Sequence, residues 1–142
     1  MTTPEPDPTP AAMLRRLENA VNTHNLDAVV DCFVPDYLNE TPAHPARGFT
    51  GSEQVRRNWA QIFGGVPDLQ ARVLRSAVDD TTVWGEWEMA GTRRDGHPHL
   101  IRGVIVFGVR DGRAQWSRFY LEPVDDSPVG VEPAVHAQVG PR

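Results

Sequence analysis

The chain has 142 residues, 39% of them hydrophobic, so it is long enough for one globular domain with a core and a single pocket. Its 14 basic and 19 acidic residues give a formal net charge of -5, which excludes the broad cationic surface that a phosphate backbone requires. No run approaches the roughly 20 apolar residues that span a bilayer. We therefore expect a cytoplasmic protein with neither nucleic acid nor a membrane as partner.

Proline is concentrated at the two ends of the chain. Eight of the 13 prolines fall within residues 1–10 or 123–142. Apolar residues are too sparse there to form a periodic face, and each proline removes a backbone donor. The composition predicts two disordered tails, residues 1–10 and 125–142, and one folded domain over residues 11–124.

Apolar residues recur at helical spacing in three segments of the first half of the chain. These segments are residues 11–24, residues 26–34 and residues 52–63. Asn25 is a suitable cap for the second helix, and Pro35 is expected to end it. Residues 37–41 then form a short extended segment. Gly64-Gly65 ends the third helix.

Extended runs follow the helices. They cover residues 69–78, 82–92, 99–109 and 114–121. The last three are joined by Asp95-Gly96 and Asp111-Gly112, which are typical of tight antiparallel hairpins. Helices grouped before an antiparallel meander predict an α+β fold with the helices on one face of the sheet.

The chain resembles the SnoaL-like polyketide cyclases of the nuclear transport factor 2-like superfamily. The resemblance covers residues 13–124 and depends on the order of the segments and on four short motifs: Val66-Pro67-Asp68-Leu69, Gly91-Thr92, Arg110-Asp111-Gly112-Arg113 and Arg118-Phe119-Tyr120-Leu121-Glu122. It implies a cone-shaped barrel, in which a curved, mainly antiparallel sheet wraps over about three N-terminal helices and leaves an apolar cavity. It also implies a homodimer that pairs through the sheet.

Membership of the superfamily does not select one function. The superfamily includes cyclases, ketosteroid isomerases, dehydratases and epoxide hydrolases, and also members that bind ligands without known catalysis. The chain carries Phe119 where SnoaL-like cyclases commonly have an acidic residue. Two functions stay open. One is a cofactor-independent isomerase, cyclase, dehydratase or epoxide hydrolase that acts on a compact apolar molecule by proton transfer. The other is a non-catalytic ligand-binding or dimeric assembly module.

One predicted strand carries a candidate acid-base pair. Glu86 and Glu88 are two positions apart, so their side chains point the same way, and burial of both would raise the pKa of one. The resemblance implies that this pair faces the cavity, with Trp84 as an aromatic wall and with Trp87 and Met89 on the outer face. The alternative is that Trp87 and Met89 face the core and both glutamates lie in solvent.

Other candidate site residues lie outside this strand. His44 precedes a proline in a loop and is a candidate general base at the cavity mouth, or a solvated histidine. Arg102 is expected to pair with one of the two glutamates across adjacent strands. Four aromatic residues are predicted to line the pocket, although their spacing is also typical of a core: Tyr37, Trp59, Phe63 and Phe119. His97 and His99 lack a third ligand, so no metal site is predicted.

Overall fold

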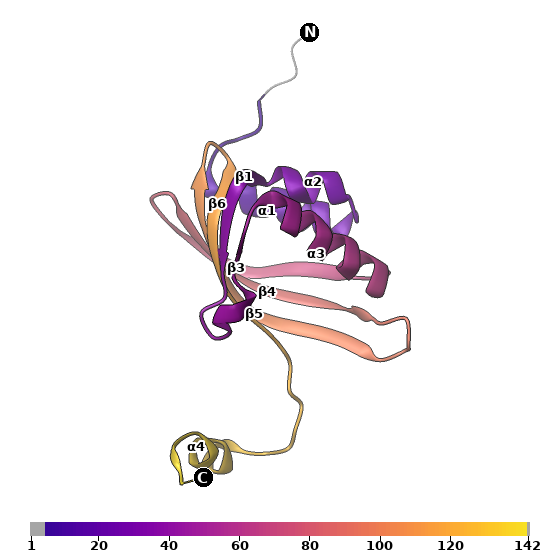
Figure 1. The fold of residues 1–142 in the computed structure, drawn as a ribbon, viewed down its shortest axis with the longest axis vertical. Helices are drawn as coiled ribbons and strands as arrows, with labels where there is room; N and C mark the ends of the chain where they lie inside the picture. The colour runs from indigo at the N-terminus through magenta and orange to yellow at the C-terminus, as the bar shows by residue number, and fades with distance from the viewer. Residues whose placement is uncertain (1–4, 142) are drawn as a thin grey trace.

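A computed structural model describes residues 5–141; residues 1–4 and 142, which belong to the predicted tails, lie outside the described residues. Three helices, α1 (Pro10–Asn22), α2 (Leu26–Asp31) and α3 (Ser52–Gly65), lie against one side of a six-stranded sheet (Figure 1). The predicted α+β architecture is confirmed.

The strands form one open sheet in the order β2-β1-β6-β5-β4-β3. Their bounds are β1 Phe33–Glu40, β2 Phe49–Thr50, β3 Gln70–Asp79, β4 Thr82–Thr92, β5 Pro98–Arg110 and β6 Arg113–Pro123. A short 3-10 helix, η1 (Pro45–Arg47), precedes β2. Among these pairings only β1 with β6 is parallel, so the prediction of a mainly antiparallel sheet is confirmed.

Glycine and register shifts allow this sheet to curve. Gly103 on β5 has a φ of 149°, and a side chain there would overlap with the backbone carbonyl of Tyr120 on the neighbouring strand. Further register shifts occur between Val73 and Arg75 on β3 and between Gly108 and Val109 on β5. Glycine kinks and bulges of this kind bend a sheet, so they account for the concave inner face on which the helices pack.

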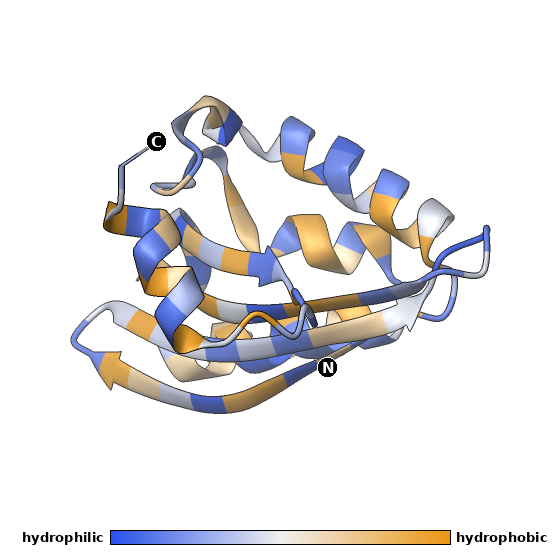
Figure 2. Cartoon of the chain, turned by 90° about the horizontal axis from the view of Figure 1, so that it is seen from below, coloured by the Kyte–Doolittle hydropathy of each residue, from blue (hydrophilic) through white to orange (hydrophobic). Residues whose placement is uncertain are grey.

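The core fills the space between that inner face and the helices. Its largest fully buried side chains are Trp87, Tyr37, Phe107, Met13, Leu14, Leu69 and Ile105. Hydrophobic and hydrophilic residues alternate along the strands, as expected for a sheet with one face packed on a core (Figure 2).

The chain enters β1 earlier than the sequence analysis predicts. Asn25 does cap α2, since its side chain accepts a hydrogen bond from the Ala28 amide at 3.1 Å. However, α2 ends at Asp31 and β1 begins at Phe33, so Pro35 lies inside a strand. Pro35 is tolerated because the pairing with β6 shifts register between Phe33 and Leu38.

Residues just before α1 contact the domain. Thr9 caps the helix by accepting a hydrogen bond from the Ala12 amide at 3.2 Å, and Pro10 occupies the first turn. The Arg16 guanidinium donates to the carbonyls of Asp7 at 2.7 Å and Gly112 at 2.6 Å. Residues 7–10 thus contact the domain beside the predicted boundary at residue 11.

A fourth helix, α4 (Val131–Val139), lies within the segment that was predicted to be a disordered tail. Residues 124–130 carry it away from the rest of the molecule (Figure 1). None of its residues is buried, and Val131 is 76% exposed. Within residues 5–141, no helix has the length and apolar character needed to cross a membrane.

We predict that the two ends differ in their effect on stability. Deletion of residues 125–142 should leave the Tm unchanged, because α4 buries nothing. Deletion of residues 1–10 should lower the Tm by a few degrees, because loss of the Thr9 cap costs about 1 kcal/mol. Differential scanning calorimetry of the two truncations tests this, and a lower Tm for the C-terminal truncation would show that α4 docks on the domain.

Candidate functional site

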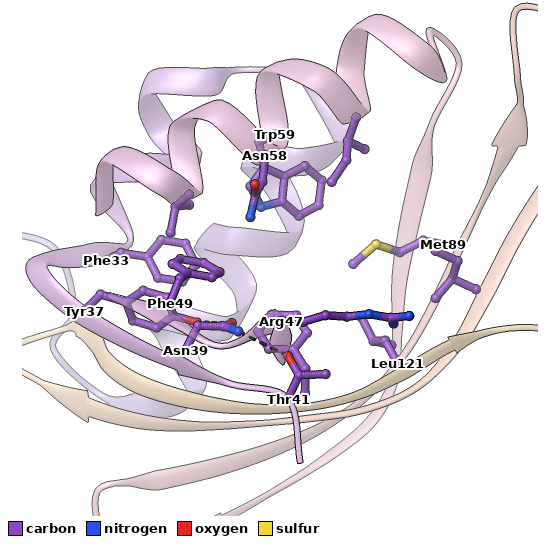
Figure 3. Close-up of a pocket in the computed structure, with 14 residues that line it drawn as sticks. Phe33, Tyr37, Asn39, Thr41, Arg47, Phe49, Asn58, Trp59, Met89 and Leu121 are labelled. Atoms are coloured by element: carbon purple, nitrogen blue, oxygen red, sulfur yellow. Dashed lines mark hydrogen bonds between the residues drawn. The ribbon is translucent and has the colours of Figure 1, made fainter. Parts of the chain in front are cut away.

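A cavity of about 290 Å³ lies between α3, β1 and the inner face of the sheet (Figure 3). Most of its lining is apolar, as is usual for small-molecule pockets. The apolar lining residues are Phe33, Phe49, Val55, Trp59, Ile62, Met89, Ile101, Phe119 and Leu121. The polar lining residues are Tyr37, Asn39, Thr41, Arg47 and Asn58.

Strand alternation and register determine which polar groups reach this cavity. Tyr37 and Asn39 are two residues apart on β1, so they share its inner face. Asn39 is paired with Ser117 in the parallel β1–β6 register. The pairing therefore brings an amide and two hydroxyl groups together at one wall of the site.

These side chains form a buried hydrogen-bond network. The Tyr37 hydroxyl donates to Asn39 Oδ1 at 3.0 Å, and the Ser117 hydroxyl lies 3.2 Å from the same oxygen. The two hydroxyls also contact each other. Asn39 Nδ2 donates to Thr41 Oγ1 at 3.3 Å. Both hydroxyl protons are thus used inside the network, which fixes the orientation of the Asn39 amide.

Tyr37 acts as a neutral hydrogen-bonding group in this network. Its side chain is 1% exposed, and burial raises the pKa of the phenol far above its usual value, although the hydrogen bond with Ser117 partly opposes this. A phenol with a raised pKa keeps its proton near neutral pH. Tyr37 can therefore orient a polar group but cannot serve as a base.

The face of β4 that points inward is opposite to the one that the resemblance implied. Trp87 is completely buried and Met89 lines the cavity, whereas Trp84 is 49% exposed on the outer face. The expectation that Trp84, Glu86 and Glu88 face the cavity was wrong. Burying an indole and a thioether is favourable, while burying two carboxylates is costly.

Both glutamates of β4 form ion pairs on the outer face. Glu86 lies 2.9 Å from Arg75 Nε. Glu88 lies 2.9 Å from Arg102 Nε and 3.1 Å from Arg72 Nη2, so the predicted pairing of Arg102 with a glutamate is a surface pairing. The hydrogen bond from Arg102, together with that from Arg72, lowers the pKa of Glu88, whereas the acid-base hypothesis needs a raised value.

Some of the remaining predicted site residues line the cavity and others lie outside it. Tyr37, Trp59 and Phe119 line the cavity. Phe63 does not line it, but stacks on His24 with ring centroids 4.7 Å apart. His44 lies outside the lining as well, where its Nε2 is 2.7 Å from Glu122 Oε1.

Some polar residues of the site were not identified from the sequence. Asn39 could have been identified, because residues 37–41 were predicted to be extended. Strand alternation then places Asn39 on the same face as Tyr37. No sequence pattern pointed to Asn58 or Arg47 as site residues, since a polar residue on a helix or in a loop is usually solvated. Among the described residues, no group of three or more His, Cys, Asp or Glu could hold a metal ion.

The sequence pattern of the SnoaL-like domain matches residues 14–116. The chain belongs to the SnoaL-like domain family. This confirms the resemblance inferred from the order of segments, and the match covers most of α1, all of α2 and α3, and the sheet as far as the first residues of β6. No curated protein sequence matches the chain.

Solved structures share the fold of this SnoaL-like domain. IdmH from Streptomyces antibioticus, described as a candidate polyketide cyclase, is 20% identical with a TM-score of 0.69 over 80% of this chain and 91% of that one. An M. tuberculosis epoxide hydrolase is 20% identical with a TM-score of 0.66, over 78% and 80% of the two chains. A candidate ketosteroid isomerase from Kribbella flavida is 20% identical with a TM-score of 0.64, over 92% and 87%. Such similarity shows the fold alone.

We predict that Glu88 titrates below the 4.5 of a free glutamate, because the native ion pairs favour its charged form. A pKa that is lower in the folded state than in the unfolded state stabilises the fold above the unfolded pKa. This stabilisation is lost as the pH falls through the folded pKa. Carboxyl ¹³C NMR titration measures the midpoint.

Arg102→Gln should raise the midpoint of Glu88, whereas Arg110→Gln, which removes an exposed arginine elsewhere on β5, should not. A midpoint above 4.5 in the unmodified protein would restore Glu88 as a candidate acid and contradict the surface assignment.

Proposed function

We propose that this SnoaL-like protein binds a compact, mainly apolar small molecule in its cavity without acting on it by proton transfer. The observation that carries the proposal is the composition of the lining, which includes no carboxylate and no imidazole within residues 5–141. Of the functions left open by the sequence, this favours the ligand-binding module.

Among residues 5–141, the lining offers no group that can accept a proton near neutral pH. A general base must lie within hydrogen-bonding distance of the proton that it removes. The ionisable residues of the lining are Tyr37, which stays protonated, and Arg47, whose guanidinium is always charged. Phe119 occupies the cavity wall at the position where an acid is common in SnoaL-like cyclases.

The cavity is nevertheless suited to binding. Its volume of about 290 Å³ is near the lower limit of typical ligand pockets, so a compact molecule fits. The network of Tyr37, Asn39 and Ser117 holds its polar wall in one arrangement, which lowers the entropy cost of binding. Structural neighbours described as a candidate polyketide cyclase and an epoxide hydrolase support a role in handling small molecules.

We predict that blocking the cavity abolishes ligand binding. The probe is 1-tetralone, a compact apolar ketone, and its affinity is measured by isothermal titration calorimetry. Leu121→Trp places a larger side chain in the cavity and should weaken binding at least about tenfold. The matched control is Leu74→Trp, because Leu74 is 43% exposed on β3 and should not affect binding.

Equal affinities for these two variants would disprove binding in the cavity. NMR of the recovered probe gives a separate readout of catalysis. Conversion of the ketone by the unmodified protein, lost in Glu88→Gln, would instead support the proton-transfer enzyme.

We further propose that the protein is a homodimer that pairs through the outer face of the sheet. Three large apolar side chains are exposed on this face: Leu38 at 42%, Trp84 at 49% and Tyr120 at 43%. Ion pairs lie among them, such as Arg75 with Glu86 and Arg118 with Glu40. An exposed apolar patch with charged neighbours suits a two-fold symmetric interface. Trp87 and Met89 cannot contribute to it, since both face inward.

We predict that light scattering at micromolar concentration gives roughly twice the 15.8 kDa of one chain. Trp84→Glu replaces the most exposed of these apolar side chains by a charge and should yield a monomer. Val131→Glu is the control, because it adds the same charge to an exposed valine on α4. A mass of one chain for the unmodified protein, or dissociation by Val131→Glu alone, would contradict the proposed interface.

A further inference from the structure

The cavity has one charged group, and that group has no partner among residues 5–141. Arg47 is the last residue of η1 and lines the cavity, and its side chain is exposed, so it lies at the opening. It takes part in none of the ion pairs or side-chain hydrogen bonds formed among these residues. Figure 3 shows its side chain extended across the cavity towards Leu121.

About half of the arginines among residues 5–141 are paired with carboxylates. Seven of them form ion pairs: Arg56, Arg72, Arg75, Arg93, Arg102, Arg113 and Arg118. The protein has a net charge of -5, so acidic residues are abundant. Six arginines among the described residues form no ion pair, and of these Arg47 alone lines the apolar cavity. The low dielectric of the cavity wall strengthens its attraction for an anion.

A second donor is oriented towards the cavity by a chain of side chains on α3. Arg57 can only donate, and its Nη2 lies 2.7 Å from Gln54 Oε1. Gln54 Nε2 then donates to Asn58 Oδ1 at 2.8 Å. The oxygen of Asn58 is thus engaged outside the cavity, which leaves both hydrogens of its amide nitrogen free. Figure 3 shows that nitrogen directed into the cavity.

The hydroxyl groups of Tyr37 and Ser117 add no free donor, whereas the Thr41 oxygen accepts from Asn39 Nδ2 and its hydroxyl proton is a further donor. The protons of Tyr37 and Ser117 are used within their network with Asn39. The free polar groups at the opening and along α3 are therefore donors, from Arg47 and Asn58, and no carboxylate lines the cavity among the described residues. Such a site favours a ligand that offers acceptor oxygens, above all a carboxylate, which pairs with a guanidinium through two hydrogen bonds.

We infer that the ligand of this protein is a compact apolar monocarboxylate. Its apolar body fills the cavity, its carboxylate binds the Arg47 guanidinium at the opening, and the Asn58 amide donates to an acceptor oxygen. This inference rests on the proposed ligand-binding function and adds the chemical class of the ligand. The carboxylate stays partly hydrated at the opening, so it avoids the full desolvation penalty of a buried ion.

Matched pairs of a carboxylate and its primary amide test the inference, because the two have nearly the same shape and differ in charge. Suitable pairs are 1-naphthylacetate with 1-naphthylacetamide and 4-phenylbutanoate with 4-phenylbutanamide. Calorimetry on the full-length protein at low salt should show the carboxylate binding about tenfold more tightly in each pair, which is typical of one charged hydrogen-bonded contact.

Variants identify the residue responsible for that preference. Arg47→Gln should reduce it to within about twofold by weakening carboxylate binding alone, as expected for loss of one ion pair. Arg110→Gln removes an equal charge from an exposed position on β5 and should preserve the preference. Asn58→Leu should weaken both members of each pair. Circular dichroism checks that the variants are folded.

The outcomes separate this inference from the function on which it rests. Amides that bind as tightly as carboxylates, or a preference that survives in Arg47→Gln, would overturn the assignment of the ligand class. Binding of 1-tetralone without binding of any carboxylate would do the same and leave the ligand-binding function intact. If neither the ketone nor any member of the pairs binds, both proposals are wrong.

Discussion

β1 runs parallel to β6, and this pairing places Asn39 opposite Ser117 with Tyr37 beside them. Three polar side chains buried at one wall must satisfy one another, since each unpaired group in such a place costs free energy. The constraint fixes the register of two strands that are far apart in sequence. It also determines which side chains of β6 face inward, so that Phe119, two residues after Ser117, joins the cavity wall.

Charge is distributed unevenly between the two faces of the sheet. The outer face carries ion pairs between β3, β4 and β5, in which Glu88 contacts arginines on both neighbouring strands. The inner face carries the apolar core, with Trp87 at its centre. Successive side chains of a strand point to opposite faces of the sheet, so a residue of β4 whose side chain lies on one face cannot reach the other. The arrangement that packs Trp87 in the core therefore removes both glutamates from the cavity.

Under the proposed ligand-binding function, this separation lets a SnoaL-like domain keep its fold while both glutamates of β4 lie outside the cavity. The fold supplies a concave sheet and helices that enclose a cavity, while function depends on the few polar groups that reach it. Here those groups are a neutral network at one wall, an oriented amide on α3 and a guanidinium at the opening. In the proposed function, these groups recognise an acceptor-rich molecule.

The sequence by itself determined the strands β4, β5 and β6, the helices α1 and α3, and the family, because helical periodicity, alternation and Asp-Gly turns are local signals. Strand alternation predicts that Glu86 and Glu88 share a face of β4. It does not predict whether that face points towards the cavity or towards solvent. Only packing against α1 to α3 decided that Trp87 and Met89 point inward. The same is true of the Asn39–Ser117 contact, whose partners are 78 residues apart, because no local pattern encodes a pairing between distant strands.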